Sequence, residues 1–257
     1  MNLECKITDF HAHTNMSYCA MPSLTPGFYA TRIAESNTVS SIVIADHGMA
    51  IYFPLEVAWT WEFICDSQIF DKFRDMGNEK LSNHIASLAK YHDKGIVPGI
   101  EVEMMDGGKL TFDESFRKDL KVVIGSVHWL PVSIKLGNSP EEVMCHWKKH
   151  TFDLINAGIH ILGHPFRWLN AQIVIPDNLI YEIIDEAQKA NIAIELNGHY
   201  HVATDLKMIR YAAQKGVRIA FGTDSHQPRE AGDLSYHLEI VKYAGLDIQN
   251  INMMKLK

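Results

Sequence analysis

The segment CKITDFHAH, residues 5–13, joins a short apolar run directly to two histidines that are one residue apart. Residues i and i+2 of an extended segment point to the same side, so His11 and His13 can bind one metal ion together. An HxH pair alone is weak evidence, because a histidine after a strand is often a core residue bonded to a carbonyl. The case for a metal site therefore depends on how the other strands end.

Six further segments have the composition of buried strands, and side chains that can bind metal follow them as well. The seven predicted strands are residues 5–10, 40–45, 95–100, 121–127, 159–163, 191–196 and 217–222. The metal-binding residue types at their ends are His11 and His13, Asp46 and His47, Glu101 and Glu103, His128, His164, Glu195, and Asp224 and His226. Coincidence does not explain so regular a pattern.

Apolar residues at helical spacing separate the strands, which is typical of βα units around a parallel sheet. The predicted helices are residues 26–36, 78–93, 139–157, 177–190, 204–215 and 233–244. Seven parallel strands predict a closed or nearly closed barrel, and no eighth strand is evident. The carboxyl ends of barrel strands meet on one face. Residues scattered over more than 200 positions would therefore share one pocket.

The mixture of imidazoles and carboxylates suits Zn²⁺, Mn²⁺ or Fe²⁺, and it contains too much nitrogen for Ca²⁺ or Mg²⁺. Two of the acidic residues have an alternative interpretation. Glu195 can be an ion-pair partner only, and Asp46 can orient His47 from behind without touching a metal.

The motifs together resemble the PHP family, the polymerase and histidinol phosphatase proteins. The matching segments, in chain order, are DFHAHT (9–14), ADHG (45–48), GIEVE (99–103), GSVH (125–128), GHP (163–165) and GTDSH (222–226). The resemblance extends over essentially the whole chain. Each motif alone is common, but the six motifs in this order are specific to the family. It implies a distorted (β/α)7 barrel with two or three metal ions, which agrees with the seven strands counted above.

The resemblance also implies a role for each ligand. Carried over by position, it assigns one metal to His11, His13, Glu101 and Asp224, a second to Glu101, His128 and His164, and a third to His47 and His226. Glu101 would then bridge the first two ions. Relatives of the histidinol phosphatase type have a further histidine eight residues after the first one of HxH, and here that position is Cys19. A thiolate is a good zinc ligand, but Cys19 can also be a small packing residue.

Composition places limits on the class of protein. With 257 residues, 47% hydrophobic and 21% charged, the chain fits one large globular domain, residues 1–257. No apolar run approaches the length of a membrane span, and the first residues do not read as a secretory signal. The net charge of −7 argues against a nucleic-acid surface. Four separated cysteines suit reduced thiols, so we expect a cytoplasmic protein with no membrane partner.

Clustered divalent metals suit hydrolysis of phosphate esters, because they stabilise both the attacking and the departing oxygen. We expect a metal-bridging hydroxide as nucleophile and a small phosphomonoester as substrate. Arg167 and Arg229 each stand three residues after a predicted ligand and are candidates to bind the phosphate. The sequence does not single out the general acid that protonates the leaving group. His199, Tyr200 and His201 are candidates for this role.

The segment 50–77 is rich in aromatic residues and follows the second strand. A long insertion at this face of a barrel usually shapes the pocket, and the alternative is an outer helix that packs on the barrel. Two other functions also stay open. One is a metal-dependent nuclease or phosphodiesterase, of the TatD-like or PHP exonuclease kind, and the other is a non-catalytic metal-binding regulatory protein.

Overall fold

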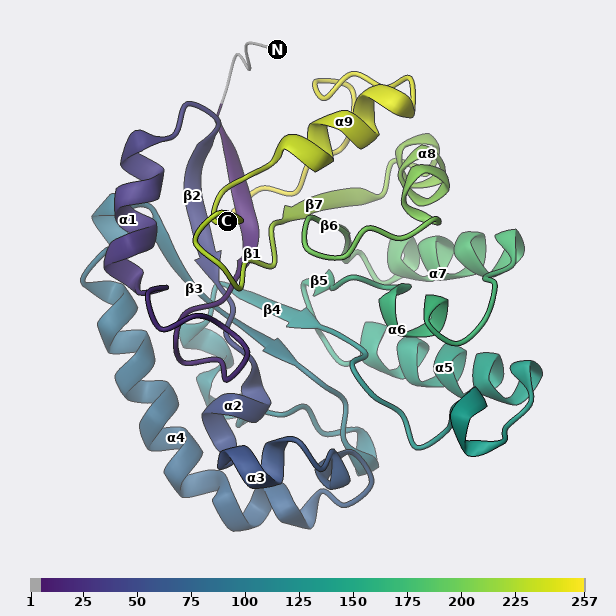
Figure 1. The fold of residues 1–257 in the computed structure, drawn as a ribbon, viewed down its shortest axis with the longest axis horizontal. Helices are drawn as coiled ribbons and strands as arrows, with labels where there is room; N and C mark the ends of the chain where they lie inside the picture. Colours follow the sequence, from purple (N-terminus) through teal and green to yellow (C-terminus); the bar gives the residue numbers. More distant parts are fainter. Residues whose placement is uncertain (1–5, 257) are drawn as a thin grey trace.

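Seven parallel strands stand side by side in chain order in the computed structural model, which describes residues 6–256 (Figure 1). The strands are β1 (Ile7–Ala12), β2 (Val39–Ile44), β3 (Ile96–Val102), β4 (Val122–Gly125), β5 (Ile161–Leu162), β6 (Ala193–Asn197) and β7 (Arg218–Gly222). All seven predicted strands are present, with ends shifted by a few residues. Cys5, predicted to begin the first strand, lies outside the described residues.

The sheet closes where the first strand meets the segment that follows the last one. His11 accepts a backbone hydrogen bond from the amide of Asp224 at 2.7 Å, and the amide of His13 donates to the carbonyl of Ser225 at 3.2 Å. Register shifts within β1 show that its pairing with β2 is irregular. The result is the distorted (β/α)7 barrel predicted from the sequence.

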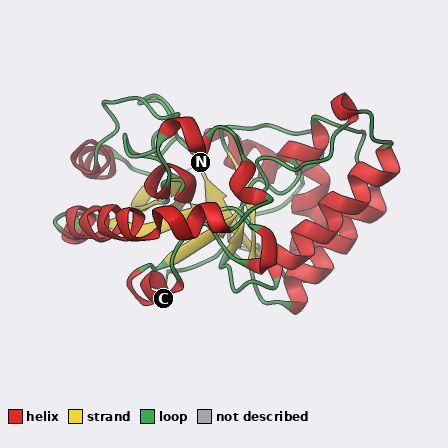
Figure 2. Cartoon of the chain, turned by 90° about the horizontal axis from the view of Figure 1, so that it is seen from below, coloured by secondary structure: helices red, strands yellow, loops and turns green. Residues whose placement is uncertain are grey.

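Helices surround the strands, as the view turned by 90° shows (Figure 2). The α-helices are α1 (Pro26–Glu35), α2 (Gly48–Tyr52), α3 (Leu55–Ala58), α4 (Gln68–Ala89), α5 (Pro140–Ile155), α6 (Arg167–Asn170), α7 (Asp177–Lys189), α8 (Asp205–Lys215) and α9 (Ser235–Tyr243). Short 3₁₀ helices are η1 (Glu62–Ile64), η2 (His92–Lys94), η3 (Asp106–Gly108), η4 (Glu114–Asp119) and η5 (Ile134–Leu136). No helix within residues 6–256 is long and apolar enough to cross a membrane.

The largest difference from the predicted elements is α4, which begins ten residues earlier than the predicted start at residue 78. Gly77 lies inside this helix, although glycine usually weakens a helix interior. A Cβ atom at Gly77 would stand 2.0 Å from the ring of Tyr52. The glycine therefore lets α2 pack closely against α4.

The segment 50–77 combines both interpretations that its sequence left open. Phe53, Phe63 and Phe70 are buried and pack together, with ring centroids 4.6 Å apart for Phe53 and Phe63. Trp59 and Trp61 instead line the cavity described below. The segment is thus partly an outer layer on the barrel and partly a wall of the pocket.

A small cluster of apolar side chains from all seven strands fills the inside of the barrel. Its members are Phe10, Val43, Ala45, Val97, Val122, Ile124, Ile161, Ala193 and Ala220. Met254 and Leu256, from the end of the chain, pack against this cluster. Side chains two and four residues after these cluster residues on the same strand also point into the barrel. The interior therefore changes from apolar to polar toward the carboxyl ends of the strands.

Candidate metal centre

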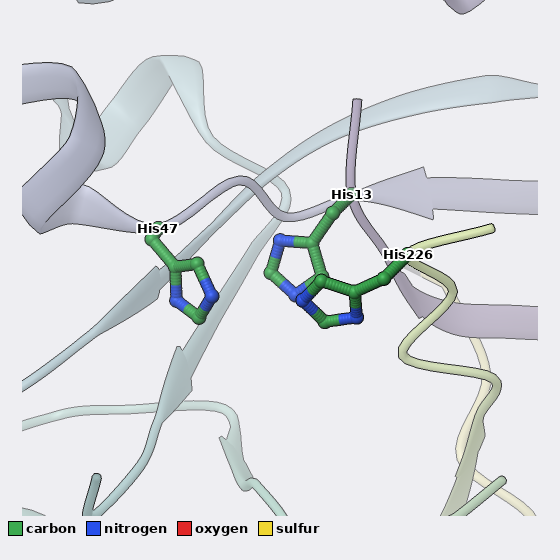
Figure 3. Close-up of side chains that lie close together, drawn as sticks. All are labelled: His13, His47 and His226. Atoms are coloured by element: carbon green, nitrogen blue, oxygen red, sulfur yellow. The ribbon is translucent and has the colours of Figure 1, made fainter. Parts of the chain in front are cut away.

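Eight candidate ligands from the sequence meet at the carboxyl ends of the strands: His11, His13, His47, Glu101, His128, His164, Asp224 and His226. Their side chains are buried or nearly so; the exposed fraction is highest for His226, at 12%. Ligand atoms of several subsets lie within 4.8 Å of one another, close enough to hold a metal ion. Figure 3 shows one such subset, His13, His47 and His226.

The two histidines of HxH lie together with Asp224, as the i, i+2 spacing predicted. The Nε2 atoms of His11 and His13 are 3.1 Å apart. Nε2 of His13 lies 2.9 Å from Oδ1 of Asp224. The Nε2 atoms of His11 and His13 lie 3.4 Å and 3.5 Å from the same oxygen of Glu101, Oε2.

Glu101 stands at the middle of the cluster, and its two oxygens face different imidazoles. Oε1 lies 2.9 Å from Nε2 of His164 and 3.3 Å from Nε2 of His128. Oε2 lies 2.7 Å from Nδ1 of His47, on the side where the HxH pair also lies. The carboxylate therefore separates two groups of nitrogen ligands.

A third group contains His13, His47 and His226, whose rings lie close together. The ring centroid of His13 is 4.3 Å from that of His47 and 4.5 Å from that of His226. The Cys19 thiol lies beside His47 and His226. Burial by itself would raise the pKa of this thiol, but the two imidazoles lower it to about 6. The side chain at position 19 thus lies beside the third group, in a form suited to metal binding.

The nitrogens that face away from the cluster are held by an outer layer of polar groups. Nδ1 of His11 donates to Glu195 at 2.8 Å, and Nδ1 of His128 donates to Glu103 at 2.9 Å. Nδ1 of His226 donates to the carbonyl of Asp224 at 2.7 Å. Such partners fix the ring orientation and direct Nε2 at a metal. Glu195 therefore has the ion-pair role that the sequence left as its alternative.

Asp46 acts through a serine rather than on His47 directly. It accepts hydrogen bonds from the amide of Thr14 at 2.8 Å and from the hydroxyl of Ser17 at 2.6 Å. Because Ser17 donates its only proton to Asp46, its oxygen accepts from Nδ1 of His13 and from the amide of His47, each at 3.1 Å. His84 of α4 lies 3.1 Å from the other Asp46 oxygen. Sequence reasoning missed Ser17 and His84.

The charges of the centre balance one another. Burial would raise the pKa of Glu101, but His128, His11 and His47 together hold it well below its usual value. Burial would lower the pKa of His11 and His47, yet the carboxylates raise both well above the usual value; Glu195 contributes most for His11, and Glu101 for His47. The carboxylates and imidazoles of the cluster thus lie against one another at the positions where cations would bind.

Several buried atoms of the cluster lack a hydrogen-bond partner among the described residues. The unpaired atoms that face the cluster are Nδ1 of His47, Oε2 of Glu101 and Nε2 of His128. The His47 and Glu101 atoms are only 2.7 Å apart but are not aligned as a hydrogen bond. Buried polar groups are normally satisfied. Unpaired nitrogen and oxygen atoms that converge in this way fit divalent cations between them.

The backbone is strained at two of the candidate ligands. His164 has φ of 23° and Asp224 has φ of 50°, a region that residues other than glycine seldom adopt. Gly222 precedes Asp224 at the end of β7, and a Cβ atom there would stand 2.0 Å from Oε1 of Glu195. The glycine makes room for the pair of Glu195 and His11. Strain of this kind concentrates at functional sites.

A cavity of about 550 Å³ opens above the cluster. Arg167, at the start of α6, lines it with its guanidinium 3.6 Å from the centroid of the Tyr200 ring. Arg229 does not line it, contrary to the sequence prediction, and instead lines a separate cavity with Arg32 and Glu35. A turn between Gln227 and Glu230 carries Arg229 away from the centre.

Of the three candidate proton donors, His199 and Tyr200 line the cavity. His201 does not line it; its ring stacks on Tyr236 with centroids 3.6 Å apart. Nδ1 of His199 lies 3.3 Å from Oε2 of Glu230. The same Glu230 oxygen accepts a hydrogen bond from the amide of His226. His199 therefore lies close to the third group of ligands.

The fold and the cluster define a (β/α)7 barrel with a candidate metal centre, and the chain was compared with known proteins. No family model matches the chain. It is 26% identical over 172 residues to the DNA polymerase/3'-5' exonuclease PolX of Bacillus subtilis (strain 168), covering 66% of this chain. The chain spans only 29% of that polymerase.

Two further proteins are matched over nearly their whole length. A probable phosphatase of Thermoanaerobacter sp. (strain X514) is 26% identical over 266 residues, covering 98% of this chain and 93% of that protein. The crystal structure of histidinol phosphate phosphatase from Lactococcus lactis, complexed with zinc, L-histidinol and phosphate, superposes with a TM-score of 0.59 at 17% identity. That match covers 94% of this chain and 95% of the other. These findings confirm the resemblance to the PHP family.

Proposed function

We propose that this protein is a metal-dependent hydrolase that cleaves a small phosphomonoester. The observation that carries the proposal is the position of Glu101, whose two oxygens face two separate groups of imidazoles. The probable phosphatase matched over 98% of the chain and the histidinol phosphate phosphatase with the same fold support the same reaction class.

The side chains present would hold two or three divalent ions, Zn²⁺, Mn²⁺ or Fe²⁺. His11, His13, Glu101 and Asp224 would hold one, Glu101 with His128 and His164 a second, and His47 with His226 a third. When bound, such ions lower the pKa of water and stabilise negative charge on phosphoryl oxygens. Glu101 would lie between two of these ions, and the outer layer of Glu195, Glu103 and Ser17 holds the imidazoles in position.

The proposal is tested by comparing a phosphomonoester with the matched diester after metal reconstitution. A monoester offers three free oxygens and a diester two, so one charge-assisted contact is lost with the diester. We expect kcat/KM for the monoester to be higher by about tenfold or more. A ratio in favour of the diester would contradict the proposal.

Phosphodiester cleavage is the second candidate, because one relative is named as an exonuclease. Rapid degradation of single-stranded DNA or RNA by the reconstituted protein would support it. The net charge of −7 disfavours a long polyanion as substrate.

Arg167 is proposed to bind the phosphate, because it is the cation that lines the cavity above the centre. Arg167→Ala should raise KM for a monoester by about 10- to 100-fold, as expected for loss of a hydrogen bond between charged groups. Metal content should stay unchanged, since Arg167 is not a candidate ligand. Arg229→Ala removes an arginine that lines a different cavity and serves as the matched control. Equal effects of the two substitutions on KM would argue against the role of Arg167.

Cys19 is proposed as a further ligand of the third metal, because its thiol lies beside His47 and His226 in the cavity. Cys19→Ala should lower the metal content by one equivalent, and Cys19→His should restore it, since imidazole is also a zinc ligand. The measurement is metal analysis after dialysis against a weak chelator. Cys65→Ala, at another exposed cysteine, is the control. Unchanged stoichiometry in Cys19→Ala would leave the thiol as a packing residue.

A further inference from the structure

The walls of the cavity above the candidate metal centre differ from its floor. The floor consists of candidate ligands, among them His47, His128 and Asp224. The walls contain the aromatic or apolar residues Met21, Met49, Trp59, Trp61 and Tyr200. Arg167 also lines the cavity. Since a metal centre accounts for the phosphate, the walls must select what the phosphate is attached to.

One wall is formed by two tryptophans from the segment between α3 and η1. Trp59 is 47% exposed, so a large part of its ring faces solvent in the cavity. It meets Trp61 edge to face, with centroids 6.2 Å apart and planes at 74°. Trp61 in turn stacks on His128 at 6.0 Å and 28°. A partly exposed indole that lines the cavity is thus joined to the candidate ligand His128 through Trp61.

Trp61 has an unusual backbone conformation for so large a residue, with φ of 60°. A bulky residue in this region costs free energy unless the surroundings require it. The conformation places the ring on the candidate ligand His128. Trp61 thus contacts both the candidate ligand His128 and the outer-layer residue Phe63, whose ring centroid lies 5.8 Å away.

Another part of the wall is Tyr200, with Arg167 stacked on it. Tyr200 meets the candidate ligand His164 edge to face at 6.0 Å. His164 and His128 are themselves only 5.0 Å apart, so Trp61 and Tyr200 stand over neighbouring imidazoles. The rings of Trp61 and Tyr200 thus lie next to the position that the alcohol part of a phosphate ester bound at the centre would occupy.

The charge of the lining excludes one kind of leaving group. Among the described residues that line the cavity, Asp224 is the one carboxylate, and it is engaged with His13 and His226. Glu230 lies behind the lining residue His199 and is engaged with it and with the amide of His226. A substrate carrying an ammonium group would lose hydration here without finding a free counter-charge, which is costly. Arg167 adds positive charge to the walls.

From these features we infer that the site selects phosphomonoesters whose alcohol carries a flat, uncharged aromatic ring. The inference rests on the proposed phosphomonoester hydrolysis. In that reaction a water oxygen bonds to phosphorus, the bond from phosphorus to the alcohol oxygen breaks, and one proton of the water passes to the departing alcohol. The ring packs against Trp59, while the phosphate lies at the centre.

Benzyl phosphate and cyclohexylmethyl phosphate form a matched pair of substrates, because their rings are similar in size and only one is flat and aromatic. With the metal-reconstituted protein, kcat/KM should favour benzyl phosphate by about fivefold or more, the effect of an aromatic contact. Trp59→Ala should bring the ratio close to one, and Trp59→Phe should retain most of it. Tyr243→Ala, at an exposed aromatic residue on α9, is the control and should change neither rate.

L-Histidinol phosphate, which carries an ammonium group, tests the charge of the lining, and we expect it to be hydrolysed less efficiently than benzyl phosphate. The reverse order would overturn the exclusion of cationic leaving groups. Equal hydrolysis of the benzyl and cyclohexylmethyl esters would leave the proposed function standing and overturn the inference. If no monoester releases phosphate, the proposed function fails. Calorimetric binding of benzylphosphonate and cyclohexylmethylphosphonate then still decides on the aromatic preference, which equal affinities would contradict.

Discussion

Glu101→Gln should remove metal and activity together. The substitution keeps the size of a side chain that is fully buried, but it removes the negative charge shared by His47, His128 and His164. Breaking a buried charge pair on one side costs about 3–5 kcal/mol, which corresponds to roughly 10²- to 4 × 10³-fold in affinity. We expect the purified variant to lose at least one metal equivalent and to show kcat/KM lower by at least that factor.

The measurement combines metal analysis with phosphate release at increasing metal concentration. Glu141→Gln makes the same chemical change at an exposed position of α5 and should retain metal and rate. Circular dichroism separates loss of metal from loss of fold. Full metal content with normal turnover in Glu101→Gln would show that this carboxylate does not bridge two ions.

The barrel could be predicted from the sequence because apolar interior residues precede the polar ones along the same strand. In β3, Val97 belongs to the interior cluster and Glu101 lies four residues further, on the same side of the strand. In β6, Glu195, which supports the candidate ligand His11 from behind, lies two residues after Ala193 on the same side. Strand periodicity therefore placed the candidate ligands at one end without any knowledge of the helices.

The residues that sequence reasoning missed depend on tertiary contacts. His84 stands on α4 between Leu81 and Leu88, where a histidine on an apolar face gives no sign of a partner. Its neighbour Asp46 comes from a distant strand end. Arg229 was placed wrongly because the turn at Gln227–Glu230, which no spacing rule predicts, decides its direction. The short helices α2 and α3 are too brief to show a helical period.

Glu195 provides the second large effect, although it is not a candidate ligand. It accepts three hydrogen bonds: from Nδ1 of His11 at 2.8 Å, from the amide of His164 at 2.6 Å and from the side chain of Asn197 at 3.1 Å. Glutamine offers one acceptor oxygen and adds donors, so Glu195→Gln cannot satisfy all three. The amide of His164 is the critical contact, because that residue has a strained backbone.

We expect Glu195→Gln to weaken metal binding by about 10- to 100-fold, the usual cost of losing a partner behind a ligand. Competition with a chelator gives the metal affinity, and kcat measured at saturating metal separates affinity from rate. Glu103→Gln is the matched variant, because Glu103 has the same role behind His128. If Glu195 acts through His11 and His164, its loss affects both of the groups that Glu101 separates, whereas the loss of Glu103 affects the His128 side alone. We therefore expect one metal equivalent to bind more weakly in Glu103→Gln and two in Glu195→Gln. Weaker binding of only one equivalent in both variants would contradict this expectation.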